Sequence, residues 1–200
     1  MFEFDAFLNA VASQVSSLFS ALVTLLIFHK IMSPKIRFSE LIRADDSPNR
    51  IRTQYSIKVA KTGIIDLVDV RIMCRLYVKD VFFTGSKMWS TYAIPVTFSE
   101  SAILGRDERV IYLSIHKSSL AEGKVGGQVR RAVQEKYEYP SITLERVFML
   151  YKQSYLKVDI MANDRFTGVL KVFSSHRYGL WALRQGKWRA DSVELILSLN

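Results

Sequence analysis

The chain has 200 residues, a formal net charge of +9 and a single cysteine. One cysteine excludes an intramolecular disulfide and any metal site built from several cysteines. The basic balance is typical of chains that contact a polyanion, and no helix-turn-helix, zinc-finger or RNP-type motif supports nucleic acid as that partner.

The first predicted element is a transmembrane helix at about residues 7–29, within an anchor of residues 1–32. Phe7 to Phe28 carry no charge, and a helix of this length crosses the ~30 Å hydrocarbon core of a bilayer. Acidic residues precede it and basic residues follow it, which predicts a single-pass protein of the inner (plasma) membrane with a cytoplasmic C-terminal domain. A cleaved signal peptide and a buried soluble helix are the alternatives, although the acidic start and the missing A-x-A site disfavour cleavage.

One face of this helix carries small polar residues at helical spacing, beginning at Asn9. Such residues let two membrane helices approach closely and hydrogen-bond across their interface. The sequence therefore predicts helix association through Ser13, Ser17, Ser20 and Thr24. The alternative is that these hydroxyls bond back to the backbone of their own helix.

A basic junction follows the helix. Ser33-Pro34 is expected to end the helix, because proline restricts the residue before it and cannot donate to the helical ladder. The anionic inner leaflet attracts basic residues held close to it. Lys30, Lys35 and Arg37 are therefore predicted to bind anionic lipid head groups of the bilayer. The alternative is the ordinary basic excess beside any inner-membrane anchor.

Residues 33–200 are predicted to form one domain made mainly of strands. Alternating or apolar runs occur at residues 55–59, 68–76, 89–98, 110–115, 155–161 and 168–173. Short strands between turn signals are typical of an all-β sandwich or barrel. In the second run, Val70, Ile72, Cys74 and Leu76 fall on one strand face and are predicted to be buried, so Cys74 is read as a small core residue.

A basic insert at about residues 120–139 interrupts this pattern. Its first half holds Gly123, Gly126 and Gly127, which predict a mobile loop. Its second half, Gln128 to Tyr137, is predicted to form a short basic helix.

Several segments together resemble one known family. Leu22–Ser39 is similar to the end of the inner helix of inward-rectifier potassium channels, with its basic linker and first cytoplasmic strand. Gln54–Ile72, Val158–Gly168, Ser175–Tyr178 and Gly186–Trp188 resemble strands and turns of their cytoplasmic domain. The resemblance implies an immunoglobulin-like sandwich of the E-set type below the membrane, a linker that engages anionic lipid, and homo-oligomerisation.

The same comparison shows what is missing. Inward rectifiers have two membrane helices and a Thr-x-Gly-Tyr-Gly-type filter between them, whereas this sequence has one apolar helix and no such filter. Potassium selectivity needs the ring of carbonyls that this loop supplies. The resemblance therefore extends to the end of the inner helix and the cytoplasmic domain, without the pore.

No catalytic motif accompanies these features. The sequence contains no H-E-x-x-H, G-x-S-x-G, P-loop or G-x-G-x-x-G pattern, so we expect no catalytic residue, metal or cofactor. We predict a membrane-anchored, cytoplasmic binding or sensing module that forms homo-oligomers and does not bind nucleic acid. One alternative is a pore lined by several copies of the single helix. A second is a membrane-bound effector or enzyme with an unrecognised pocket.

Overall fold

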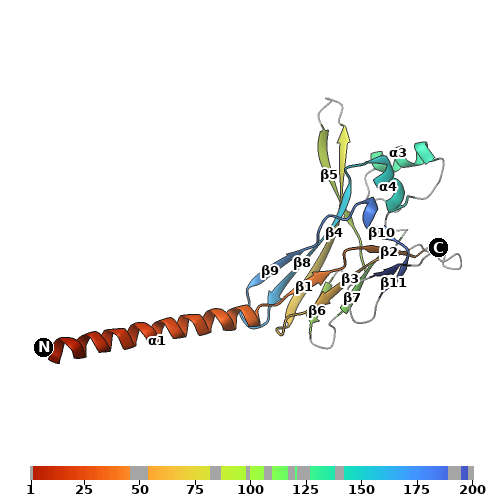
Figure 1. The fold of residues 1–200 in the computed structure, drawn as a ribbon. Helices are drawn as coiled ribbons and strands as arrows, with labels where there is room; N and C mark the ends of the chain where they lie inside the picture. Colours follow the sequence, from red (N-terminus) through yellow and green to blue (C-terminus); the bar gives the residue numbers. More distant parts are fainter. Residues whose placement is uncertain are drawn as a thin grey trace.

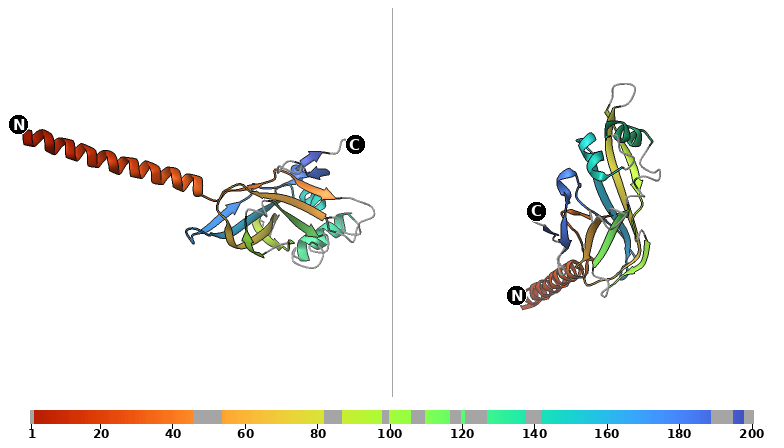
Figure 2. Two further views of the ribbon diagram at one scale, coloured as in Figure 1. Left: turned by 90° about the horizontal axis from the view of Figure 1, so that it is seen from below. Right: turned by 90° about the vertical axis from the view of Figure 1, so that its right-hand side faces the viewer.

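The computed structural model describes residues 2–45, 54–81, 87–97, 100–105, 110–116, 120, 127–137, 142–188 and 195–197. It consists of a long N-terminal helix, α1 (Phe2–Met32), followed by a β-rich domain (Figure 1). In its span Val11–Phe28, the mean hydropathy is 1.9 and none of the window is buried in the protein. The helix projects away from the domain in both further views (Figure 2).

This helix begins earlier and ends later than the predicted 7–29, and it stops immediately before Ser33-Pro34 as expected. The end has a local cause, because Pro34 has no backbone N–H and disfavours helical geometry at Ser33. By length and composition α1 can cross a membrane, and a signal sequence near an N-terminus passes the same test.

The first sheet is built around β3 (Gln54–Lys61). One edge of β3 pairs antiparallel with β1 (Ile36–Phe38) and then β2 (Ile42–Asp45), and the other edge pairs with β7 (Val110–His116). The short β10 (Leu183–Arg184) runs parallel to β2 and completes the sheet.

The second sheet is built around the long strand β4 (Leu67–Val81). One edge pairs with β6 (Glu100–Leu104) and β5 (Lys87–Ile94), and the other edge pairs with β8 (Tyr155–Asp164). Strand β9 (Leu170–Ser174) forms a hairpin with β8. A separate two-stranded sheet joins β11 (Gly186–Trp188) to β12 (Leu195–Leu197).

The inner faces of the two large sheets share one hydrophobic core, so the domain is sandwich-like. Tyr55, Ile57 and Val59 of β3 are buried together with Leu156 and Val158 of β8. The four residues predicted to be buried on one face of β4 are confirmed as core: Val70, Ile72, Cys74 and Leu76. Burial raises the pKa of the Cys74 thiol well above its ordinary value, as expected for a core cysteine.

A β-bulge interrupts the alternation at the start of β4. The pairing with β8 shifts between Val68 and Arg71, and Asp69 has a positive φ of 53°. Leu67 and Val70 are therefore both buried, while Val68 is only half-buried. Simple alternation continued back from Val70 would put Val68 on the buried face, and the extra residue of the bulge displaces it.

Two helices cover one end of the sandwich, far from α1 (Figure 1). Helix α3 (Gly127–Tyr137) confirms the predicted basic helix, whereas residues 121–126, where a mobile loop was predicted, lie outside the described part of the chain. Helix α4 (Leu144–Leu150) was not predicted, because it has only 7 residues. The Thr143 side chain caps it by accepting a hydrogen bond from the Arg146 backbone N–H.

Candidate functional site

The end of α1 is joined to the domain by a short junction that packs against the turn between β3 and β4. The backbone N–H of Thr62, in the turn between β3 and β4, donates to the Lys35 carbonyl over 2.9 Å. Gly63 packs so closely that an added Cβ would lie 2.7 Å from the Lys35 nitrogen and 2.8 Å from the Pro34 Cα. A side chain at position 63 would therefore separate the helix end from the domain.

The predicted lipid-binding residues lie at this junction. Lys35 follows Ser33-Pro34 at the end of the helix, Arg37 lies on β1, and both are exposed. The side chain of Lys30 lies outside the described residues. Contact of these three residues with lipid head groups stays a prediction.

The predicted association face lies on free helix surface. Ser13, Ser17, Ser20 and Thr24 are all exposed. Thr24 Oγ1 donates a hydrogen bond of 2.8 Å to the Ser20 carbonyl of its own helix. At this position the hydroxyl therefore bonds back to its own helix backbone, which was the alternative to an interhelical contact. Helix association through this face also stays a prediction.

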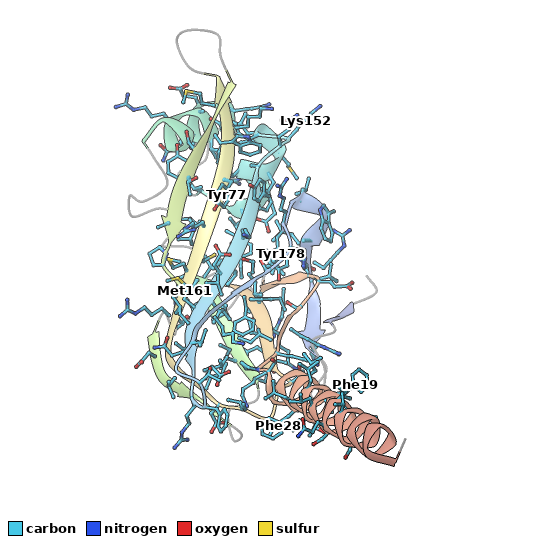
Figure 3. The ribbon with its side chains drawn as sticks, turned by 90° about the vertical axis from the view of Figure 1, so that its left-hand side faces the viewer. Phe19, Phe28, Tyr77, Lys152, Met161 and Tyr178 are labelled. Carbon is cyan, nitrogen blue, oxygen red and sulfur yellow. The ribbon has the colours of Figure 1, made fainter. Side chains whose placement is uncertain are left out.

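A cleft opens at the opposite end of the domain, where α4 leads into β8. Its volume is about 630 Å³, and its lining includes Lys152, Tyr155, Arg177, Trp181 and Arg184. We call these five residues and the space between them the cationic–aromatic cleft. Figure 3 shows Lys152 and Phe28, which lies near the end of α1, at opposite ends of the β-rich domain.

The cleft has a positive electrostatic character. Three of its lining side chains are cations, and none of the described residues that line it is acidic. The Arg177 guanidinium lies 4.8 Å from the ring centroid of Tyr155, a cation–π arrangement that holds it at the wall. Arg184 Nη1 donates to the Leu183 carbonyl over 2.8 Å, which orients the second guanidinium.

Aromatic stacking fixes both walls of the cleft. Tyr155 stacks on Tyr77 of β4 at 4.8 Å between ring centroids, and Trp89 of β5 meets Tyr155 edge-on at 5.4 Å. On the other wall, the Trp181 ring stacks on His176 at 5.8 Å. The His176 Nε2 atom lies 3.0 Å from the Glu40 carbonyl oxygen, which connects this wall to the first sheet.

The polar groups of the cleft are suited to binding an anion. Guanidinium and ammonium groups are pure hydrogen-bond donors, and guanidinium matches the geometry of carboxylate and phosphate groups. The Ser154 hydroxyl in the cleft already donates to the Tyr151 carbonyl over 2.6 Å. Among the described residues, no group of three His, Cys, Asp or Glu side chains is placed to hold a metal.

Sequence reasoning did not find this cleft. Lys152 lies in a turn, and the two arginines come from a segment without a periodic pattern. The available signal was that Arg177 and Arg184 flank two aromatic residues, Tyr178 and Trp181. Only the fold brings that segment to Lys152.

No family model and no curated protein sequence matches the chain. Among solved structures, the sporulation control protein Spo0M from Bacillus subtilis matches with a TM-score of 0.33 and 9% sequence identity. The match covers 74% of this chain and 49% of the Spo0M chain, so this chain spans about half the length of that structure.

Proposed function

We propose that this chain is a membrane-anchored binding protein without catalytic activity, whose domain presents the cationic–aromatic cleft to an anionic ligand. The observation that carries the proposal is the unburied apolar surface of α1: the window Val11–Phe28 contributes nothing to the protein core. Exposed apolar surface of this extent is stable in lipid and unfavourable in water.

The basic junction supports the orientation of the proposed anchor. Lys35 and Arg37 are exposed beside the end of α1. Together with Lys30 they place basic residues at the head-group level on the domain side of the membrane, which favours a cytoplasmic domain. We propose that these residues contact anionic lipid head groups of the inner membrane.

The finer fold class also belongs to this proposal. Two sheets packed over one core support an immunoglobulin-like sandwich of the E-set type. With the residues that resemble the cytoplasmic domain of inward rectifiers, this supports a relationship to those domains and a homo-oligomeric assembly.

Anchoring is tested by expressing the full chain and washing membranes with alkaline carbonate. The protein should stay in the pellet and be released by detergent, whereas a variant lacking residues 2–32 should be released by the wash. Intact mass of the membrane-bound protein provides the control for processing. Removal of about the first 28 residues, which is the signal-peptide outcome, would contradict the proposal.

Ligand binding is tested with a defined probe, the planar anion pyrene-1,3,6,8-tetrasulfonate, on the full chain in nanodiscs of neutral lipid. Arg177→Gln and Arg184→Gln should each weaken binding by up to about fivefold, because an exposed ion pair contributes ~0.2–1 kcal/mol. Arg71→Gln and Arg131→Gln, which remove exposed charges outside the cleft, are matched controls. Equal losses in all four variants would show non-specific attraction by net charge and contradict a cleft site.

A further inference from the structure

A second apolar surface lies at the turn between β8 and β9. Phe166 is 67% exposed, Val169 is 54% exposed and Leu170 is 61% exposed. In the neighbouring β3–β4 turn, Ile64 is 50% exposed. We call these four side chains the membrane-proximal tip. Clustered exposed apolar side chains on a soluble domain mark an interaction surface, whereas single ones are ordinary.

Hydrogen bonds fix the shape of the turn that carries the tip. The buried Asp164 carboxylate accepts from the Phe166 N–H over 2.9 Å and from the Thr167 N–H over 3.2 Å. Gly168 takes a φ of +67° and donates its N–H to the Asp164 carbonyl over 2.7 Å. The turn is therefore held in a conformation that directs its apolar side chains outward.

The two turns of the tip are also joined to each other. The Arg165 N–H donates to the Asp66 carbonyl over 3.1 Å, and the Arg165 guanidinium lies 3.4 Å from the Asp66 carboxylate. The buried Lys61 ammonium lies 3.4 Å from the other oxygen of Asp66. The Asp66 charge is thus paired within the domain, and the tip presents no free carboxylate at this point.

The end of α1 sets the depth of the tip. Phe28 is the last residue of the apolar window that is long enough to span a membrane, and its ring centroid lies 6.4 Å from that of Phe166. A helix that crosses the bilayer with Phe28 at the edge of the hydrocarbon region therefore carries Phe166 to nearly the same depth. Phe, Trp and Leu are the apolar side chains typical of segments that lie in the membrane interface.

The charges around the tip complement a lipid surface. Arg165 lies in the β8–β9 turn itself, Lys171 follows Leu170 on β9, and the Lys35 carbonyl is bonded to Thr62 in the turn that carries Ile64. Lys35 and Arg165 are exposed. Each basic residue held near an anionic leaflet adds to the attraction of the domain for that leaflet. An apolar centre with a basic rim is the pattern of a surface that inserts shallowly into the interface.

We propose that the membrane-proximal tip is a second membrane contact, inserted into the interfacial region of the leaflet from which α1 emerges. The inference rests on the proposed membrane anchoring by α1. Two membrane contacts, α1 and the tip, would fix the tilt of the domain relative to the bilayer. A single helix and its junction would not fix this tilt. The cationic–aromatic cleft lies at the other end of β8, about 30 Å along the strand from the tip, given ~3.3 Å per residue of strand.

The test measures the depth of single spin labels on the full chain in nanodiscs containing anionic lipid. Cys74 is buried with a raised thiol pKa, so an introduced cysteine is labelled selectively. In Phe166→Cys and Leu170→Cys, the label should be more accessible to oxygen than to a water-soluble nickel chelate. Phe19→Cys in α1 serves as the lipid-embedded reference, and Met149→Cys, which is 52% exposed on α4, serves as the aqueous reference.

Each outcome decides the matter. If the labels at positions 166 and 170 are as accessible to the nickel chelate as the label at position 149, while the label at position 19 lies in lipid, the second contact is overturned and the anchor stays intact. Labels at 166 and 170 shielded from both reagents, with spin–spin broadening that disappears on dilution with unlabelled protein, would assign the tip to a second copy and overturn the inference. If the label at position 19 is as accessible to the nickel chelate as the label at position 149, both the membrane anchor and the membrane contact of the tip are overturned.

Discussion

Two buried tyrosines join separate elements of the domain through hydrogen bonds of their hydroxyls. Tyr178 donates its hydroxyl to the Ser39 carbonyl over 2.6 Å. The Tyr55 hydroxyl donates to the Glu145 carboxylate over 2.5 Å and accepts from the Leu144 N–H over 3.2 Å. Burial raises the pKa of both phenols above their ordinary value of 10.0, and the Glu145 charge raises that of Tyr55 further.

These shifts predict alkaline destabilisation. Both phenols are neutral in the folded and unfolded states below pH 10, whereas above it only the unfolded state ionises them readily. The free energy of unfolding should therefore fall above pH 10, by up to about 1.4 kcal/mol per pH unit for each phenol. Denaturant titrations in detergent at several pH values measure this slope. Tyr178→Phe should lower stability at pH 7 and make the alkaline slope shallower, and an unchanged slope would contradict the assignment to Tyr178.

Ile72 tests the packing of the sandwich core. It is 5% exposed and lies between Val70 and Cys74 on the buried face of β4. Ile72→Ala should lower the free energy of unfolding by ~2–5 kcal/mol, because it leaves a cavity in a close-packed interior. Chemical denaturation followed by near-ultraviolet circular dichroism measures the change. Ile64→Ala, at an exposed position, should change it by no more than about 0.5 kcal/mol, and equal effects would contradict the packing.

The exposed face of α1 is the element whose role in assembly can be tested most directly. Replacing Ser17 and Ser20 by leucine should weaken self-association, measured by energy transfer between labelled copies in vesicles. The expected loss is modest, since hydrogen bonds between membrane helices average ~0.6 kcal/mol each, and the bulk of leucine adds separation. Gln14→Leu removes a polar group off this face and is the matched control.

Ion flux across the same vesicles separates two roles of this face. A pore lined by it should lose conductance in the double variant even where copies remain associated. Association without flux in the wild type favours the binding module. A wild type that stays monomeric would contradict both roles and leave α1 as a simple tether.

At the scale of the whole molecule, β8 connects the two candidate surfaces. Its first residue, Tyr155, lines the cleft, and its last residue, Asp164, organises the turn beside α1. Pairing with β4 along its length keeps these ends in a fixed relation. The position of the cleft relative to the turn beside α1 is therefore set by the sheet.

Topology is the prediction at this scale. A reporter fused after Asn200 should report cytoplasm, because Lys30, Lys35 and Arg37 resist translocation. Alkaline phosphatase and green fluorescent protein fusions give opposite signals on the two sides and control for expression. A reporter active outside the cytoplasm would contradict the proposed orientation, and replacing the three basic residues with glutamine should weaken the orientation preference if they determine it.

Local patterns determined a large part of this architecture. The uncharged run Phe7–Phe28 predicted α1, and Pro34 predicted its end, because both depend only on neighbouring residues. Alternation identified the buried residues of β4 from Val70 onward and the strand at Val110. The bulge at Asp69 was not visible, since it arises from the register with β8.

Tertiary structure alone decided the surfaces that bear on function. Arg177 and Lys152 share a cleft, and Phe166 lies beside Phe28, although no short-range pattern connects either pair. Such contacts depend on how strands pair and how turns are directed, which are long-range properties of the sheet. The sequence by itself determined which segments are apolar and extended, whereas the packing of two sheets determined where the charges and the exposed aromatic rings meet.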